Sequence, residues 1–333
     1  MIADTLNFTT VTNVNSPIGI DYHAPANSLI VSYNYGSGSP YNFARIYTNL
    51  VVSNSVVMTN VVVTNWSGVH GAGEEVKLAT VKASASGFTN GEIYFGSGVG
   101  IGWVSADGTR SNMNWCVLTN AIVTNALPLR GSLYVDQTGV FSNQVIAVAS
   151  EGSFSSSRKG VWRVDAQAHP TLLTNLATAH LEGVITLPND TNRWGSWAGK
   201  IITGDEDFSP NPVIYTIAAN GAVVLYDTTN LISGGIHPED FDIIPTNQNL
   251  YCVAFDDANI GASSIVKLSK DYFTDYVGDL LITDAGENVA PAKFFIVHWD
   301  AANTNFVTRR VQFFDPSRRF EHVTFAPIDL PTR

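Results

Sequence analysis

Six segments of the chain repeat one pattern, which is an apolar strand, an acidic or glycine-rich loop, and a second strand. In chain order they read LIVSYNYGSGSPYNFARIY, EIYFGSGVGIGWVSADG, VIAVASEGSFSSSRKGVWRVDA, KIITGDEDFSPNPVIYTIAANG, LYCVAFDDANIGASSIVKLS and LLITDAGENVAPAKFFIVHWD. A repeat of this length predicts an array in which each copy is one small sheet that buries its faces against its neighbours. Six copies predict six blades.

The composition favours strands over helices. Charged residues make up 14% of the 333 residues, against about 25% in an average globular protein, while Gly, Asn, Thr, Ser and Val are abundant. No long window carries apolar residues at helical spacing, whereas runs such as SLIVSYNY and FFIVHWD are rich in β-branched and aromatic residues. We therefore expect an all-β fold, a six-bladed β-propeller that occupies residues 1–333 as a single domain.

A charged residue recurs where a new repeat begins. Glu74, Arg130, Glu182 and Glu239 follow one another at roughly 55 residues, a pitch that suits a four-stranded blade with generous loops. The predicted blades span residues 16–66, 70–122, 128–176, 180–231, 237–275 and 276–333.

The sixth repeat, which begins with LLITDAG (280–286), has no opening strand in front of it. Near the C-terminus, RFEHVTFAP reads like AHLEGVITLP and IHPEDFDIIP, which open earlier repeats. We therefore expect residues 321–327 to return as the innermost strand of the last blade, which closes the ring and removes a free sheet edge. The segment KDYFTDYVGD (270–279) has no predicted place.

In such a ring the openings of the inner strands face the axis, and the loops between second and third strands share their end of the channel. Glu182, Glu239 and, through the C-terminal strand, Glu321 are then expected to converge. Gathered carboxylates repel unless they are protonated, paired with cations or bound to metal. We expect Ca²⁺, which takes about six to eight oxygen ligands, with Mg²⁺ or Mn²⁺ as alternatives. The structural alternative is that these glutamates cap backbone N–H groups or pair with Arg130.

Three further residues are candidates for catalysis. His180 and His237 precede Glu182 and Glu239 by two residues, a spacing that aims both side chains the same way along a strand, so either histidine is a candidate general base. Arg130 takes the place that Glu holds elsewhere, either to neutralise the acidic ring or to bind a substrate carboxylate or phosphate through its planar fork. Candidate substrate contacts on the same face are Asp205, Asp256 and Tyr33.

The tripeptides LEG (181–183) and PED (238–240), each opening an inner strand, resemble the inner-strand openings of the six-bladed metal-dependent propellers. That group includes the senescence-marker-protein/gluconolactonase and paraoxonase families, the phytase-like propellers and the calcium-dependent PhoX-type phosphatases. The resemblance implies that a Glu at this position binds a metal at the axis. In this chain the implied ligand is Glu182 and, by repetition, Glu239 and Glu321.

Two functions remain open at this point, because a catalytic and a structural ion use the same carboxylates. The first is an exported metal-dependent hydrolase that acts on a lactone, ester or phosphoester. The second is a non-catalytic extracellular propeller that binds glycan or protein and is stiffened by calcium. A third, weaker hypothesis is a metal-dependent lyase of the streptogramin-inactivating type.

Charge and composition narrow the partners and the location. The formal net charge is −11, which disfavours nucleic acid and anionic membrane surfaces, and no apolar run reaches the length of a membrane span. The first residues lack a signal-peptide pattern, yet a low lysine content with abundant Asn, Thr and Ser is typical of an exported bacterial protein, extracellular or periplasmic. Cys116 and Cys252 lie in strand-like runs and are predicted to be buried free thiols.

Overall fold

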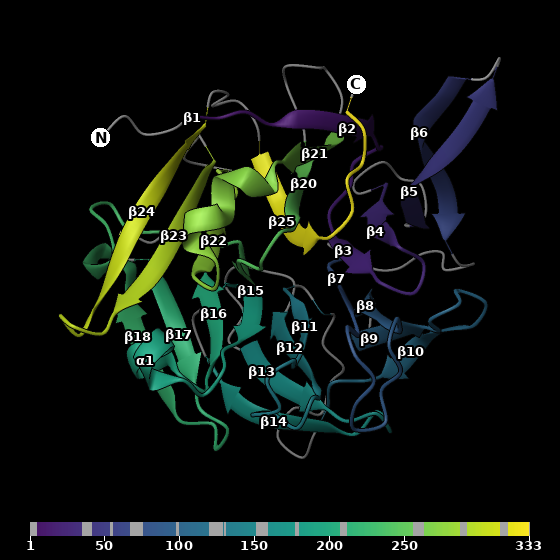
Figure 1. Cartoon of the computed structure of the whole chain (residues 1–333). Helices are drawn as coiled ribbons and strands as arrows, with labels where there is room; N and C mark the ends of the chain where they lie inside the picture. The colour runs from purple at the N-terminus through teal and green to yellow at the C-terminus, as the bar shows by residue number, and fades with distance from the viewer. Residues whose placement is uncertain are drawn as a thin grey trace.

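Six small sheets stand in a ring around a central channel (Figure 1). The structure is a computed structural model, and it describes residues 5–34, 42–53, 56–66, 76–97, 100–119, 129, 131–150, 159–176, 180–206, 212–255, 263–286, 292–313 and 319–332. The innermost strands β3, β7, β11, β15, β19 and β25 neighbour one another in that order and close the circle. The prediction of an all-β, six-bladed propeller is confirmed.

The first four blades each consist of four consecutive antiparallel strands. Blade 1 holds β3 (Ile20–His23), β4 (Ser28–Tyr33), β5 (Asn42–Ser53) and β6 (Val56–Trp66); blade 2 holds β7 (Leu78–Thr80), β8 (Ile93–Ser97), β9 (Gly100–Val104) and β10 (Ser111–Cys116). Blade 3 holds β11 (Leu133–Val135), β12 (Val145–Ser150), β13 (Lys159–Val164) and β14 (Pro170–Asn175); blade 4 holds β15 (Leu181–Thr186), β16 (Ile201–Asp205), β17 (Val213–Ile217) and β18 (Val223–Asp227).

The last two blades interleave along the chain. Blade 5 holds β19 (Asp240–Ile243), β22 (Leu280–Asp284), β23 (Lys293–Asp300) and β24 (Asn305–Phe313), with β1 (Thr5–Leu6) added in parallel at its outer edge. Blade 6 holds β25 (Arg319–Ala326), β20 (Asn249–Phe255), β21 (Ser264–Leu268) and β2 (Thr9–Asn13). Both ends of the chain therefore contribute to blade 6.

The C-terminal strand does supply an innermost strand, but its predicted partner was wrong. β25 pairs with β20, with Cys252 opposite Val323, whereas β22 pairs with β19, with Asp240 opposite Thr283. The predicted ranges 237–275 and 276–333 therefore do not correspond to whole blades. The physical reason is packing, because Phe241 belongs to the same hydrophobic cluster as Leu280 and Ile282, while the side chains of β25 pack with those of β20.

The described helices are short and lie in turns. They are α1 (Thr191–Trp194) and the 3₁₀ helices η1 (Gly195–Trp197), η2 (Thr228–Asn230) and η3 (Lys270–Tyr276). The segment without a predicted place, 270–279, thus forms η3 rather than a strand. None of the helices in the described ranges is long and apolar enough to cross a membrane.

The core is divided among the interfaces between blades. The described residues form six hydrophobic clusters, one between each pair of adjacent blades. Strand β12 shows why, because Val145 and Ala147 pack toward blade 2 while Ile146 and Val148 pack toward blade 4. Successive side chains of a strand point to opposite faces, so a strand that is apolar on both faces binds two neighbours. Cys116 and Cys252 are buried free thiols, as predicted.

Candidate functional site

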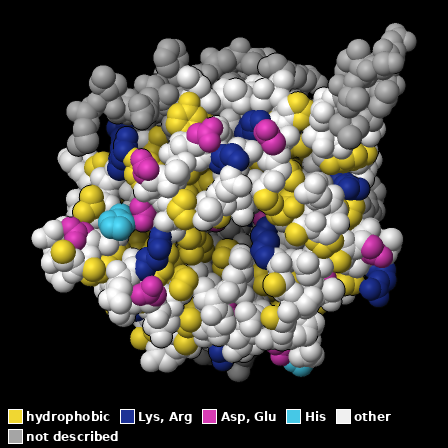
Figure 2. All heavy atoms as spheres, in the orientation of Figure 1, with side chains coloured by type: hydrophobic (Ala, Val, Ile, Leu, Met, Phe, Trp, Pro, Cys, Tyr) yellow, Lys and Arg dark blue, Asp and Glu magenta, His cyan; other side chains and the backbone are white. Residues whose placement is uncertain are grey.

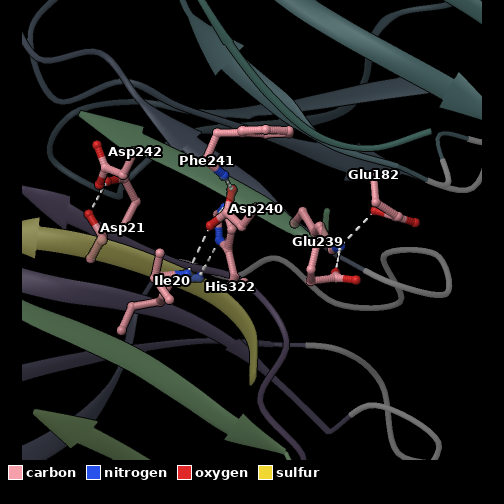
Figure 3. A network of polar contacts seen from close by, with 12 residues as sticks. Ile20, Asp21, Glu182, Glu239, Asp240, Phe241, Asp242 and His322 are labelled. Atoms are coloured by element: carbon pink, nitrogen blue, oxygen red, sulfur yellow. Dashed lines mark hydrogen bonds and ion pairs between the residues drawn. The ribbon is translucent and has the colours of Figure 1, made fainter. Parts of the chain in front are cut away.

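The acidic residues predicted to converge do lie at one end of the channel. The start of β15 and the end of β16 share this end, since Leu181 pairs with Asp205. Glu182, Glu239 and Glu321 are at most 5% exposed, and the charges of Glu182 and Glu321 both act on Glu239. We call this end the acidic end of the channel. Glu182 and Glu239 are seen side by side in Figure 3.

A lysine that the sequence reasoning missed lies between two of these carboxylates. Lys77 Nζ is 2.6 Å from Glu182 Oε2 and forms a second ion pair with Glu239 Oε1, and its side chain is 1% exposed. Lys77 holds the same place in blade 2 that Glu182 holds in blade 4, because each lies opposite the glycine of the second strand, Gly96 or Gly204. The sequence does contain a sign of this equivalence, because EIYFGS aligns with KIITGD and places the two glycines at the same position of the second strand.

Among the described residues, the acidic end brings four carboxyl groups, those of Glu182, Glu206, Glu239 and Glu321, close to one lysine, Lys77. The pKa of Glu239 is raised well above its usual range, chiefly by burial, and the charges of Glu206, Glu321 and Glu182 raise it further while Lys77 lowers it. A buried carboxyl with a raised pKa is stabilised by any cation that approaches it. The site is therefore suited to bind a positive ion in addition to the lysine.

One group of side chains at this end could hold a metal ion. His180, Glu182 and Glu206 each offer one ligand atom, and these three atoms lie within 4.8 Å of one another. His180 Nε2 lies 3.4 Å from Glu182 Oε1, and His180 Nδ1 lies 3.3 Å from Glu206 Oε2. Glu182 Oε1 is buried and receives no hydrogen bond from the described residues. We call these three residues the His–Glu–Glu cluster.

The backbone holds this cluster in place. The His180 N–H donates to Asp205 Oδ1 at 2.9 Å, and the His180 carbonyl accepts from the Glu206 N–H at 2.9 Å. His180 precedes β15 and Glu206 follows β16, so the antiparallel pairing brings both to the same edge. Glu206 was not among the ligands predicted from the sequence.

Two of the other predicted site residues, His237 and Tyr33, lie in blades 5 and 1. His237 is half-buried and lies near Asp284 in blade 5. Burial raises the pKa of the Asp284 carboxyl, and the charges of Lys293 and His237 oppose that rise. Tyr33 donates its hydroxyl to Asn65 Oδ1 at 2.9 Å, within blade 1. Arg130 and Asp256 lie outside the described residues.

The contacts of His322 give this residue a structural role and not that of a general base. Its Nδ1 accepts the Ile20 N–H at 3.0 Å, which places the ring proton on Nε2, 3.3 Å from Asp240 Oδ2 (Figure 3). Burial, with the nearby charge of Lys77, lowers the pKa of His322 to about 3. The neutral imidazole therefore links blades 1, 5 and 6.

The ring of sheets and its buried charged centre define a six-bladed β-propeller. No protein-family profile matches the sequence, and no curated protein matches it. Among solved structures it is similar to a gluconolactonase from Xanthomonas campestris, with 9% identity, a TM-score of 0.49, and coverage of 94% of this chain and 82% of that one. The extracellular domain of a hybrid two-component system from B. thetaiotaomicron gives 9% identity and a TM-score of 0.45, covering 97% of this chain and 41% of the other. These likenesses carry no argument about function.

Proposed function

We propose that the chain is a metal-dependent hydrolase that acts on a lactone, ester or phosphoester at the acidic end, with its ion bound by His180, Glu182 and Glu206. The observation that carries the proposal is the His–Glu–Glu cluster, whose three ligand atoms lie within 4.8 Å of one another. One imidazole nitrogen with two carboxylate oxygens suits Mn²⁺ or Zn²⁺ better than the all-oxygen shell that Ca²⁺ prefers.

The ion could lie either among Glu182, Glu239 and Glu321 or beside His180, and the position of Lys77 favours the second. An ion bound jointly by Glu182, Glu239 and Glu321, as predicted for calcium, has to displace an ammonium that is already paired with two of the three. An ion on the side of His180 uses Glu182 Oε1 and leaves the Lys77 pairs intact. Breaking a buried ion pair typically costs about 3–5 kcal/mol, so the second position is the less costly one.

The residues around the cluster have separate roles in this proposal. When bound, the ion would polarise the carbonyl or phosphoryl oxygen of the substrate and lower the pKa of a bound water. Lys77 fixes Glu182 through Oε2, and Asp205 fixes the backbone of His180. Because His180 is used as a ligand, the predicted role of general base passes to His237.

The experiment is a metal titration of chelator-treated protein by calorimetry with Mn²⁺, Zn²⁺, Ca²⁺ and Mg²⁺, followed by hydrolysis assays with gluconolactone, p-nitrophenyl acetate and p-nitrophenyl phosphate. We expect one site that prefers Mn²⁺ or Zn²⁺. His180→Ala and Glu206→Gln are expected to weaken binding at least about tenfold, since each removes one ligand. His169→Ala, at a histidine whose side chain is 76% exposed, is the matched control.

The outcomes separate the parts of the proposal. If the two variants bind the ion as tightly as the wild type, the cluster is not the metal site. If the ion binds there and no substrate is hydrolysed, the hydrolase is overturned and the ion is structural, as in the non-catalytic alternative. A preference for Ca²⁺ that is lost in Glu239→Gln restores the axial calcium site.

We also propose that the protein works outside the cytoplasm. The support is compositional, namely few lysines and many Asn, Thr and Ser residues in an acidic chain. Fractionation of the producing cells, with immunodetection in each fraction, tests this location. Detection only in the cytoplasm contradicts it.

A further inference from the structure

Beyond the acidic end, the channel contains a cavity of about 510 Å³. Its wall comes from all six inner strands and begins one residue beyond the acidic end, at Leu78, Asp240 and His322. Thr80, Asp242 and Thr324 lie three residues beyond Lys77, Glu239 and Glu321, roughly 10 Å further along the axis at about 3.3 Å per strand residue. Figure 2 shows the molecule hollowed where the blades meet. We call this space the channel cavity, and its strand residues include Tyr22, Thr80, Tyr134, Thr186, Asp242 and Thr324.

Asp21 is held as a fixed carboxylate in the wall of the channel cavity. Its Oδ2 accepts the Thr80 N–H at 2.7 Å, and its Oδ1 accepts the Tyr22 N–H at 2.7 Å and the Thr324 hydroxyl at 3.0 Å. Lys82 forms an ion pair with the same Oδ1. The charge of Asp21 is therefore balanced within the wall.

The carboxyl of Asp242 points toward Asp21 (Figure 3). It accepts fewer hydrogen bonds from the described residues than the Asp21 carboxyl does. Its Oδ2 accepts the Phe325 N–H over 3.3 Å, and the Ile243 N–H also donates to this carboxyl. Burial and the charge of Asp21 raise its pKa to about 7, while Lys82 opposes the shift. Near neutral pH this carboxyl can either donate or accept a hydrogen bond.

The remaining lining combines unused polar atoms with apolar surface. Thr80 Oγ1 is buried and has no hydrogen-bond partner among the described residues. Gln137, Gln248, Tyr134 and Phe241 also line the cavity. A pocket of roughly 300–1,000 Å³ with a few convergent polar groups on an apolar wall is typical of a small-molecule site.

We propose that the channel cavity binds a neutral, hydroxyl-rich molecule of mono- or disaccharide size, with Asp21, Asp242 and Thr80 as its polar contacts. Vicinal hydroxyls are both donors and acceptors, which matches a fixed carboxylate, an adjustable carboxyl and an unpartnered hydroxyl. An anionic ligand is disfavoured because it would lie against two carboxyl groups. A cationic ligand is disfavoured because it would compete with Lys82 for Asp21. The aromatic rings provide flat surfaces for the apolar face of a sugar.

The proposed saccharide contacts differ from the proposed metal ligands, because Thr80 and Asp242 lie three residues further along the inner strands than Lys77 and Glu239. The ionisable groups around Asp242 are Asp21, Lys82, Asp240, Asp136, Tyr134 and His322. Asp136 is already occupied, since it accepts the Thr186 hydroxyl at 2.8 Å and the Phe141 N–H at 2.9 Å. Asp240 accepts backbone N–H groups from Phe241 and Val323. Asp242 therefore remains the adjustable group.

The experiment is ligand-detected saturation-transfer NMR and calorimetry on the full chain, with glucose, N-acetylglucosamine, cellobiose and myo-inositol as neutral probes. Glucosamine and gluconate serve as the charged counterparts. We expect at least one neutral probe to bind about tenfold more tightly than its charged counterpart. Asp242→Ala and the isosteric Thr80→Val are each expected to weaken that binding about tenfold. Thr80→Val keeps the backbone N–H that Asp21 uses, so it tests the cavity even if Asp242→Ala folds poorly.

Two further variants control for position. Asp300→Asn changes an acid at the end of β23, where its carboxyl accepts the Ala302 N–H of the following turn, and is expected to leave binding unchanged. Glu206→Gln, which is expected to weaken metal binding, is also expected to leave saccharide binding unchanged. The proposal is overturned if no neutral probe binds at about 10 mM, if Thr80→Val binds as well as wild type, or if binding is lost in Glu206→Gln.

Discussion

Lys77 places its ammonium between the carboxylates of Glu182 and Glu239, in the volume where the sequence predicted an ion. The convergence of the glutamates was predictable because they recur at equivalent positions of the repeat. The lysine was not, because the repeat pattern assigned Glu74 to that position in blade 2 and not Lys77. Glu206 was missed as a ligand for a related reason, since its role depends on the pairing of β15 with β16 and not on any local motif.

We predict that Lys77→Met lowers the free energy of unfolding by about 3–5 kcal/mol at pH 7, because it leaves buried carboxylates without their cation. Urea denaturation measures the change, and Lys270→Met, at an exposed lysine that contacts Asn247, is the control with little expected effect. Calcium at millimolar concentration is expected to restore part of the stability of Lys77→Met and to leave that of the wild type unchanged. A variant as stable as the wild type contradicts the role of Lys77.

Asp242 gives a second prediction at the scale of the residue, namely the direction in which its contribution to stability changes with pH. Its pKa is raised from 3.8 to about 7 in the folded state, so the folded chain keeps a proton that the unfolded chain has lost between these values. The stability contributed by this proton is present below pH 3.8 and is lost as the pH rises through 7. We predict that Asp242→Asn, which cannot ionise, gains roughly 2–3 kcal/mol relative to wild type between pH 5 and pH 8.5, at about 1.4 kcal/mol per pKa unit.

Urea midpoints of both proteins at the two pH values test this. The other titrating groups are common to both chains, so their contributions largely cancel in the difference. Stability curves that run parallel across this range contradict the raised pKa of Asp242.

At the scale of the element, a β-bulge in β15 aims the side chains of the cluster. The register shifts between Glu182 and Val184, and Gly183 has a φ of +60°. Leu181 and Val184 therefore both pack into the hydrophobic cluster shared by blades 3 and 4, although residues three apart on a regular strand point to opposite faces. Glu182 is left facing the axis.

We predict that Gly183→Ala destabilises the protein by roughly 2–4 kcal/mol and weakens metal binding. A Cβ there meets the ring of Phe241 at 2.7 Å and the Glu239 carbonyl oxygen at 2.8 Å, which adds steric overlap to the cost of a left-handed backbone. Gly139→Ala is the matched control, because Gly139 has a φ of +75° with no atom within 4 Å, so only the backbone cost of about 1 kcal/mol is expected. Equal losses in the two variants contradict the role of the bulge contacts.

Individual strands were predictable, whereas their order in the last two blades was not. A run such as FFIVHWD is apolar on both faces and forms β23 between two strands. The segments EDFDII and FEHVTF both read as inner strands, and neither contains information on which second strand it joins. That choice depends on side chains far away in sequence, such as Phe241 with Leu280.

At the scale of the molecule, the ring is closed by contacts between residues far apart in the chain. β25 brings residues 319–326 beside β3, where His322 Nδ1 accepts the Ile20 N–H. Strand β2 adds the outer edge of the same blade. The number of blades and the use of the C-terminal strand follow from the repeat, because a ring whose last copy lacks an inner strand leaves an open sheet edge.

This closure predicts that removing β25 and removing β1 have very different effects. A chain ending at residue 318 loses the inner strand of blade 6, and with it Phe320, Val323 and Phe325 from the cluster between blades 5 and 6. Burying each such side chain contributes roughly 1.5–3 kcal/mol, a loss comparable to the whole stability of an average domain. We therefore expect no cooperative urea transition and exposure of the channel.

Of the described elements, deleting residues 1–6 removes β1 alone, which adds two residues in parallel to the outer edge of blade 5. We expect it to shift the free energy of unfolding by less than about 1 kcal/mol, the effect usual for changes away from the core. A synthetic peptide of residues 319–333 is expected to restore the cooperative transition to the chain ending at 318, because the groove between blades 5 and 1 retains its partners for β25. Cooperative unfolding of that shortened chain without the peptide contradicts closure by β25, since the other five inner strands would then suffice to hold the ring.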